Sequence, residues 1–251
     1  MPEPQPNGGA TSRLSGAPLD VIKLAAAVLM LGDHVNTALL NSGVPLLWRF
    51  GRIAFPLFCF VLACHLVRGA DAPRYARGLL LVGIVTQPVF AAAFRVEFAN
   101  ILFSLAAGAV LAAALLKQGG WRAHLALAAG TAVVFAWQAR ARTGVDFGLA
   151  GMLLPAALAL VLTGARWHVV WAAVLLFCLN ARARRGPDET WIGGASLDAL
   201  FAGLGGLAAI GLALLFRGKP RFLPRYALYM FYPGHLLALA LLRAWSAGPA
   251  P

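Results

Sequence analysis

Two adjacent ionisable residues, Asp33 and His34, stand inside an otherwise apolar stretch near the start of the chain. An imidazole titrates near neutral pH, so it can take a proton from a reacting group or carry an acyl group for a short time. On a helix, the polar residues of this stretch fall within one arc of about 100°: Lys23, Asp33, His34, Thr37 and Asn41. Because ionisable groups facing lipid are costly, this helix is predicted to line an internal cavity.

A second histidine, His235, is expected at a similar depth. With a rise of about 1.5 Å per residue, His34 lies roughly 18–20 Å into a helix that starts near residue 21. His235 lies roughly 14 Å into a last helix that starts near residue 226. Both positions are close to the middle of a hydrocarbon layer about 30 Å thick. Polar contacts that merely hold helices together are the alternative explanation for this pair.

Other polar residues stand where apolar runs begin. Arg52 opens the second run, GRIAFPLF at 51–58, and is either an interfacial anchor or part of a site. Asp33 is offset from His34 by about 100° around the helix, so it is expected to orient a different cation. Three further residues fit a helix cap as well as they fit a site, because such groups favour helix N-termini: Glu97, Asn100 and Asp146.

The composition places these residues in a membrane protein. Apolar residues make up 61% of the 251-residue chain, against about 45–50% in soluble domains. The net charge of +12 falls mostly in short gaps between apolar runs, as in membrane proteins, and this argues against nucleic-acid binding. The three cysteines lie inside apolar runs and are expected to be small buried side chains, with no metal or haem site.

The predicted fold is an all-α, polytopic integral membrane bundle with about nine (8–10) transmembrane helices, because each crossing needs about 20 apolar residues. The Pro- and Gly-rich segment 1–18 is expected to be a disordered tail, residues 19–246 one membrane domain and residues 247–251 a short tail. The predicted helices are 21–40, 47–67, 76–94, 98–116, 122–139, 146–163, 167–180 (a short one), 195–216 and 226–244.

The distribution of basic residues indicates an orientation. With nine spans, Lys and Arg are more numerous in the gaps on the N-terminal side, which favours a cytoplasmic N-terminus. The N-terminal side then holds Arg74, Arg77, Arg217 and Arg221. Arg49 and Arg52 fall on the opposite side, and inverting the topology would exchange these assignments.

Seven sequence blocks, taken together and in order, resemble the TraX family. They are LDVIK (19–23), MLGDH (30–34), GRIAFPLF (51–58), RYARGLLL (74–81), FANILFSLAAG (98–108), VDFGLAGMLLP (145–155) and YMFYPGHLL (229–237). The resemblance implies a bacterial inner-membrane protein of a family associated with N-terminal acetylation of conjugative pilin. It also implies a distant likeness to transmembrane acyltransferases that have an essential intramembrane histidine.

By this resemblance, the candidate catalytic residues are His34, Asp33, Arg52 and His235. The acyl donor would be acetyl-CoA, and the acceptor a pilin or another envelope molecule. A cytoplasmic polyanion needs a basic rim, for which the orientation offers Arg74, Arg77, Arg217 and Arg221. Two other functions also fit the residues: a proton-coupled transporter or flippase, and a non-catalytic factor for pilus or envelope assembly.

Overall fold

The computed structural model describes residues 14–138, 146–164, 167–181 and 191–246. Within these ranges there are nine α-helices and no strand, which confirms the all-α prediction. In chain order the helices are α2 (Ala17–Ala38), α3 (Pro45–Val67), α4 (Ala72–Phe94), α5 (Ile101–Gln118), α6 (Gly120–Gln138), α7 (Gly148–Leu162), α8 (His168–Ala181), α9 (Trp191–Leu214) and α10 (Ala227–Ser246).

The predicted terminal tails fall largely outside the described residues. Residues 1–13 of the predicted tail 1–18, and all of 247–251, lie outside them. Leu14 is buried and α2 begins at Ala17, so the helical part of the chain starts slightly before residue 19.

The predicted count of about nine spans is not confirmed. In the described parts of the chain, five helices are long and apolar enough to cross a membrane, namely α3, α4, α5, α9 and α10. Helices α7 and α8 have only 15 and 14 residues, and a full crossing takes about 20. Helix α2 has 22 residues, but Asp20, Lys23 and Asp33 interrupt its apolar sequence.

Helix boundaries follow local signals in the sequence. Pro45 opens α3, where its missing N–H is harmless. Asp71 caps α4 by accepting the backbone N–H of Arg74 at 3.1 Å, and Asn100 caps α5 by accepting that of Leu102 at 3.0 Å. The capping interpretation of Asn100 is therefore confirmed.

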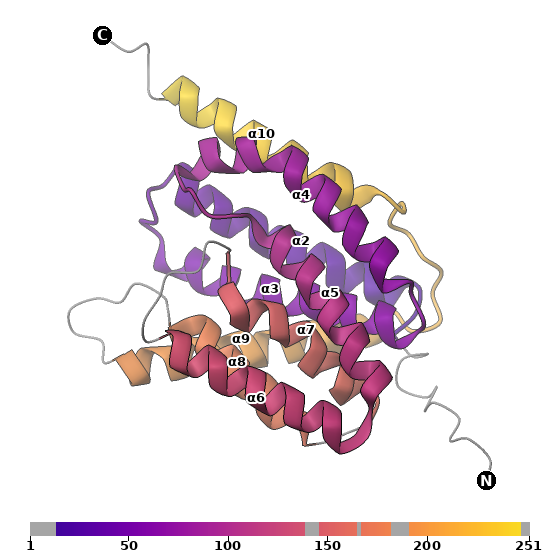
Figure 1. Ribbon diagram of the computed structural model, residues 1–251. Coiled ribbons are helices and arrows are strands. Elements are labelled where there is room, and N and C mark those ends of the chain that lie inside the picture. Colours follow the sequence, from indigo (N-terminus) through magenta and orange to yellow (C-terminus); the bar gives the residue numbers. More distant parts are fainter. Residues whose placement is uncertain (1–13, 139–145, 165–166, 182–190, 247–251) are drawn as a thin grey trace.

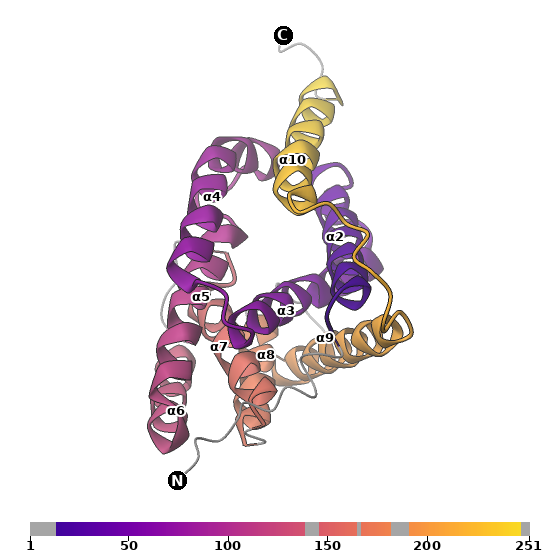
Figure 2. The same cartoon turned by 90° about the vertical axis from the view of Figure 1, so that its right-hand side faces the viewer.

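Helix α3 is central to the bundle. It packs against α2, α5, α7 and α9, and side chains along its length, such as Phe55, Leu57 and Cys59, are buried. Figures 1 and 2 show α2, α3, α5, α4 and α10 arranged as a ring, with α6 to α9 on the α3 and α5 side of it. The candidate catalytic residues Asp33, His34, Arg52 and His235 belong to helices of this ring.

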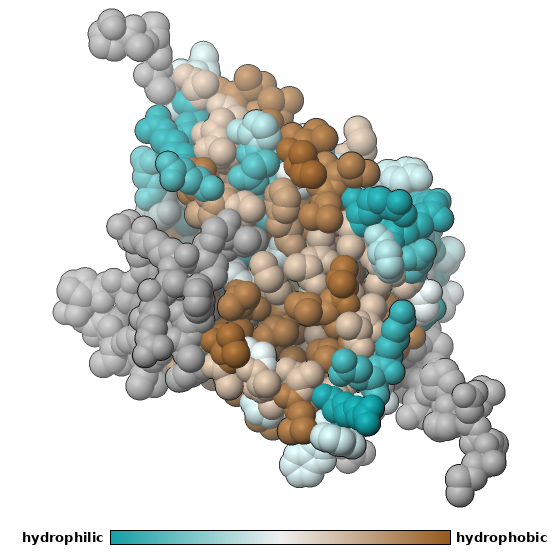
Figure 3. Space-filling model, viewed as in Figure 1, coloured by the Kyte–Doolittle hydropathy of each residue, from teal (hydrophilic) through white to brown (hydrophobic). Residues whose placement is uncertain are grey.

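The outer surface carries many large apolar side chains. Examples lie on α4 and α9: Leu81, Ile84, Val85, Leu200, Leu204 and Leu207. Figure 3 shows an apolar band across one face, with hydrophilic patches on either side of it. This distribution is typical of a protein that contacts lipid around its middle.

Candidate functional site

The two histidines predicted at similar depth are in direct contact. His34 Nδ1 lies 2.8 Å from His235 Nε2, and the two rings are nearly parallel, with centroids 5.1 Å apart. Phe94 of α4 packs edge-on against His34, and Phe231 stacks on His235. Aromatic rings therefore hold both imidazoles, which we call the histidine pair, in fixed orientations.

The hydrogen bonds of the pair assign its protons when both rings are neutral. His235 Nδ1 lies 2.9 Å from the carbonyl oxygen of Phe231, and a carbonyl can only accept, so this nitrogen carries hydrogen. His235 Nε2 then has a lone pair and accepts from His34 Nδ1–H. His34 Nε2 is left with a free lone pair. This atom is the basic nitrogen of the site.

Asp33 pairs with a cation on another helix, in agreement with its predicted offset from His34. Its Oδ2 lies 3.5 Å from Arg52 Nη2 of α3. The guanidinium of Arg52 also faces the rings of Trp48 and Phe147, at 5.0 and 5.5 Å from their centroids. A distance of 3.5 Å is long for a charge-assisted hydrogen bond. These contacts hold Arg52 in place, and its guanidinium keeps hydrogen-bonding capacity for a further group.

The close approach of α2 and α3 at this point depends on Gly51. A Cβ added there would overlap the Cβ and Cγ atoms of Asp33. We predict that Gly51→Ala displaces Asp33, lowers stability by about 1–3 kcal/mol and reduces activity. Gly32→Ala, in the same interface, is the control, because its Cβ would meet only Leu47 at 3.6 Å. Thermal unfolding in detergent measures both, and equal melting temperatures would contradict the prediction.

His34 of the histidine pair and both members of the Asp33–Arg52 pair line one cavity of about 200 Å³, here called the polar cavity. Its walls come from α2, α3, α4, α5, α10 and the start of α7. They include Met30, Asp33, His34, Thr37, Gly51, Arg52, Phe55, Phe90, Phe94, Ile101, Asp146, Phe147 and Tyr232. Of the five residues predicted on one polar arc of the first helix, three lie in this wall: Asp33, His34 and Thr37. Asn41 lies beyond the end of α2, in a turn with positive φ.

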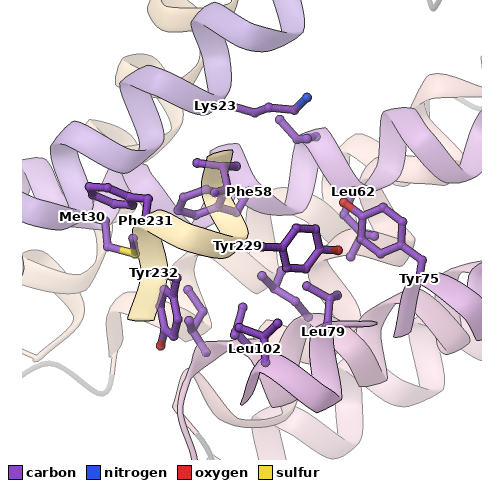
Figure 4. Close-up of a pocket in the computed structure, with 15 residues that line it drawn as sticks. Lys23, Met30, Phe58, Leu62, Tyr75, Leu79, Leu102, Tyr229, Phe231 and Tyr232 are labelled. Carbon is purple, nitrogen blue, oxygen red and sulfur yellow. The ribbon is translucent and has the colours of Figure 1, made fainter. Parts of the chain in front are cut away.

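A smaller apolar cavity of about 100 Å³ adjoins the polar one and shares Met30, Ile101 and Tyr232 with it. Figure 4 shows Lys23 at one end of this apolar cavity and Tyr232 at the other. The remaining lining is aromatic and aliphatic, with Phe58, Leu62, Leu79 and Leu102 among its members. The apolar cavity is suited to a slender, weakly polar ligand.

A third cavity of about 790 Å³, the basic cavity, adjoins the apolar one and shares Lys23, Tyr75 and Tyr229 with it. Its lining includes the basic residues Lys23, Arg74, Arg221 and Arg225, with His65 beside them. The predicted basic rim is therefore brought together in part. Arg74 and Arg221 line the cavity, whereas Arg77 and Arg217 are not among its lining residues.

Helix α2 runs beside all three cavities. Lys23 lines the basic and apolar cavities, Met30 the apolar and polar cavities, and His34 the polar cavity. Eleven residues separate Lys23 from His34, a rise of about 16 Å along the helix. The three cavities are therefore arranged in series from a basic opening to the histidine pair.

A buried carboxylate holds the segment before α10 against α2. Asp20 is only 1% exposed, and its Oδ2 accepts the backbone N–H groups of Phe222 and Leu223 at 3.0 and 2.9 Å. Its Oδ1 lies 3.2 Å from Lys23 Nζ and 3.7 Å from Arg221 Nε. Asp20 therefore organises one wall of the basic cavity.

Comparison with known proteins identifies the family. Residues 18–243 match the family model described as "TraX protein". The chain belongs to the TraX family. The resemblance predicted from the sequence blocks is thereby confirmed.

Relatives of this TraX-family chain match it over most of its length. Protein TraX of Escherichia coli is 31% identical over 230 residues, which cover 89% of this chain and 86% of that protein. Protein TraX of Escherichia coli strain K12 is 30% identical with the same coverage. The probable fimbrial assembly protein FimC, serogroup H1, of Dichelobacter nodosus is 27% identical over 87% of this chain and 92% of that protein. No solved structure matches the chain significantly.

The site of this TraX-family chain also contains Asp146, which the sequence left open between a helix cap and a site, and two aromatic residues that were not predicted there. Asp146 lines the polar cavity, and its backbone is held by Ala99 and by the hydroxyl of Ser104. Phe147 stacks on Phe55 with centroids 4.0 Å apart. Tyr232 stands in the FYPGH block, three residues before His235. That i, i+3 spacing places Tyr232 and His235 on one face of α10 and was the available signal.

Proposed function

We propose that this protein is a membrane-embedded acyltransferase that transfers the acetyl group of acetyl-CoA to an amine of an envelope acceptor, such as the N-terminus of a pilin. One observation carries the proposal: His34, with a free Nε2 lone pair, lies at the end of a series of cavities that opens on a basic surface. A basic opening, a narrow apolar passage and a terminal base match the phosphates, the pantetheine arm and the thioester of the donor, in that order.

The residues of the polar cavity supply the groups that the reaction needs. The acceptor nitrogen attacks the acetyl carbonyl carbon, the new C–N bond forms, and the C–S bond breaks to release CoA. His34 Nε2 takes the proton that the nitrogen loses and returns it to the departing sulfur. Arg52 stabilises the negative charge that develops on the carbonyl oxygen.

Asp33 is suited to bind the acceptor. Its Oδ1 is buried and has no hydrogen-bond partner among the described residues. A carboxylate oxygen accepts hydrogen bonds only, so its partner must be a donor. In the proposed reaction that donor is the N–H group of the incoming amine.

The proposal includes an orientation. The basic cavity is lined by the start of α2, the end of α3 and the starts of α4 and α10, at Lys23, His65, Arg74 and Ala227. Acetyl-CoA is cytoplasmic, so the basic cavity would face the cytoplasm, and the N-terminus of α2 with it. This agrees with the orientation expected from the basic residues, in a bacterial inner membrane.

The proposed acceptor rests on the family resemblance and on the relatives' names, one of which is a probable fimbrial assembly protein. Incubation of the purified protein with acetyl-CoA and a peptide bearing a free N-terminus tests the reaction. We expect CoA release together with a mass increase of one acetyl group on the peptide. Comparison of intact envelope proteins from cells with and without this chain then identifies the natural acceptor.

Two experimental outcomes would favour a different function. Solute uptake that depends on a pH gradient and releases no CoA would indicate a proton-coupled transporter or flippase, for which a histidine in a cavity is also suited. A requirement for the protein in pilus or envelope assembly that survives the loss of His34 would indicate a non-catalytic assembly factor.

Arg74 provides a test of the donor end of the cavities. We predict that Arg74→Gln raises the KM for acetyl-CoA about tenfold and leaves kcat close to wild type. The reason is that hydrogen bonds to charged groups contribute about 1.5–3 kcal/mol, whereas the distant reacting groups are unchanged. Arg122→Gln, on α6, is the control, because Arg122 lines none of the three cavities. A fall in kcat with an unchanged KM would contradict donor binding at the basic cavity.

A further inference from the structure

The hydroxyl of Tyr232 is a buried polar group without a partner. The side chain is in the interior, with 5% of the residue exposed, and the hydroxyl makes no hydrogen bond within the described parts of the chain. Buried hydroxyls are almost always hydrogen-bonded, because an unmet donor loses its hydration without compensation. A ligand that brings an acceptor is one explanation for such a group.

Tyr232 is placed between the donor passage and the reacting groups. It lines both the apolar cavity and the polar cavity. Its ring contacts that of His235 edge-on, with centroids 5.5 Å apart. Figure 4 shows its hydroxyl turned away from Lys23, and therefore away from the basic end of the series. A thioester at the junction of the two cavities would lie beside this residue.

A second buried donor belongs to the same wall. Arg52 Nε is also buried and without a hydrogen-bond partner among the described residues, and Arg52 lines the polar cavity with Tyr232. A neutral phenol and a guanidinium N–H both donate. Two unmet donors at one cavity match an oxygen that gains negative charge.

We propose that the Tyr232 hydroxyl, together with Arg52 Nε, binds the acyl carbonyl oxygen of the donor, which makes Tyr232 a catalytic residue. The inference rests on the proposed function and adds to it the group that binds this oxygen. As the acceptor nitrogen bonds to the carbonyl carbon, negative charge moves onto the oxygen, and Tyr232 stabilises it by a hydrogen bond while keeping its own proton. The C=O double bond forms again when the C–S bond breaks, and the oxygen loses its negative charge. The amine proton goes to His34, as before.

The Tyr232→Phe variant tests the inference, since it keeps the ring and removes only the hydroxyl. We expect kcat to fall about 100-fold or more, which is the usual effect of removing one donor to such an oxygen. The melting temperature should be equal to or above that of wild type, because an unmet buried hydroxyl is removed. A purely structural tyrosine would give the reverse, with a lower melting temperature and normal kcat.

Thr131→Val is the matched control. It also removes a buried hydroxyl, but that hydroxyl bonds to Leu127 within α6, and Thr131 lines none of the three cavities. We expect Thr131→Val to retain wild-type kcat. A Tyr232→Phe enzyme with kcat within twofold of wild type would overturn the inference.

A binding measurement separates this inference from the proposed function. The probes are CoA and the ketone analogue of acetyl-CoA in which a methylene group replaces the thioester sulfur. We expect Tyr232→Phe to bind CoA as wild type does and the ketone at least fivefold more weakly. An equal loss of affinity for both probes, or no loss for either, would overturn the role of Tyr232 but not the proposed function. A wild-type protein that neither binds CoA nor transfers acetyl would overturn the proposed function and this inference with it.

Discussion

The His34→Ala variant is expected to lose acetyl transfer almost completely, by about 10²–10⁴-fold in kcat, as when a general base is removed. His34 Nε2 is the basic nitrogen that the hydrogen bonds of the histidine pair leave free, and no other imidazole lines the polar cavity in the described residues. Insertion and accumulation in the membrane should be normal, since the apolar face of α2 is unchanged. CoA release by the purified variant, normalised to protein amount, measures the effect.

His124→Ala is the matched control. His124 accepts a hydrogen bond from Trp171 and packs against His168, on α6 and α8, so its loss should leave kcat unchanged. Full activity of His34→Ala would remove the basis of the proposed mechanism, and loss of accumulation would show that the residue acts in folding.

The double variant His34→Ala/His235→Ala tests whether the two rings act as one unit. His235 orients His34 and fixes its proton on Nδ1. The double variant should therefore be no less active than His34→Ala alone, because residues that act together are strongly non-additive. If the activity loss of the double variant instead equals the product of the two single-variant losses, His235 has a separate catalytic role.

Two features of the site were predictable from the sequence because they depend on one helix at a time. Depth along α2 and α10 predicted a similar level for His34 and His235, and a constant rise per residue makes such estimates robust. The angular offset of Asp33 from His34 predicted that the two would take different partners. In the structure the two histidines are at one level and in contact, and Asp33 pairs with Arg52 instead.

Features that depend on how helices pack against one another were less predictable. Apolar runs predicted the helices, but the same runs suggested nine spans, whereas α7 and α8 are too short to count as spans by length. Hydropathy does not distinguish a short helix buried among others from one that crosses a membrane. Likewise, Asp146 and Phe147 reach the polar cavity only because α7 packs against α3 and α5.

The basic residues illustrate the same limit at the level of single side chains. Charge counting assigned Arg74, Arg77, Arg217 and Arg221 to one side of the membrane. Arg74 and Arg221 line the basic cavity and Arg77 and Arg217 do not. This difference depends on how the helices pack. Arg74 and Arg77 are three residues apart on one helix and only about 60° apart around its axis, so helical periodicity alone does not distinguish them.

Removal of the Asp20 carboxylate is expected to have the largest effect on stability. Asp20→Ala should lower the melting temperature by about 10 °C, because breaking a buried ion pair costs about 3–5 kcal/mol. The variant loses the acceptor for two backbone N–H groups and leaves Lys23 without its partner. The segment before α10 would then no longer be held against α2, so the KM for acetyl-CoA should rise as well. Thermal unfolding in detergent and donor titration measure the two effects.

The Asp20→Asn variant separates the two halves of this interaction. The carboxylate uses Oδ2 for Phe222 and Leu223, and Oδ1 for Lys23 and Arg221. An asparagine whose carbonyl takes the place of Oδ2 keeps the backbone hydrogen bonds and loses the ion pairs. If the backbone bonds hold the segment, Asp20→Asn should retain most of the stability that Asp20→Ala loses. Equal losses would assign the effect to the charge, and no loss in either variant would contradict a role for Asp20 in forming the wall of the basic cavity.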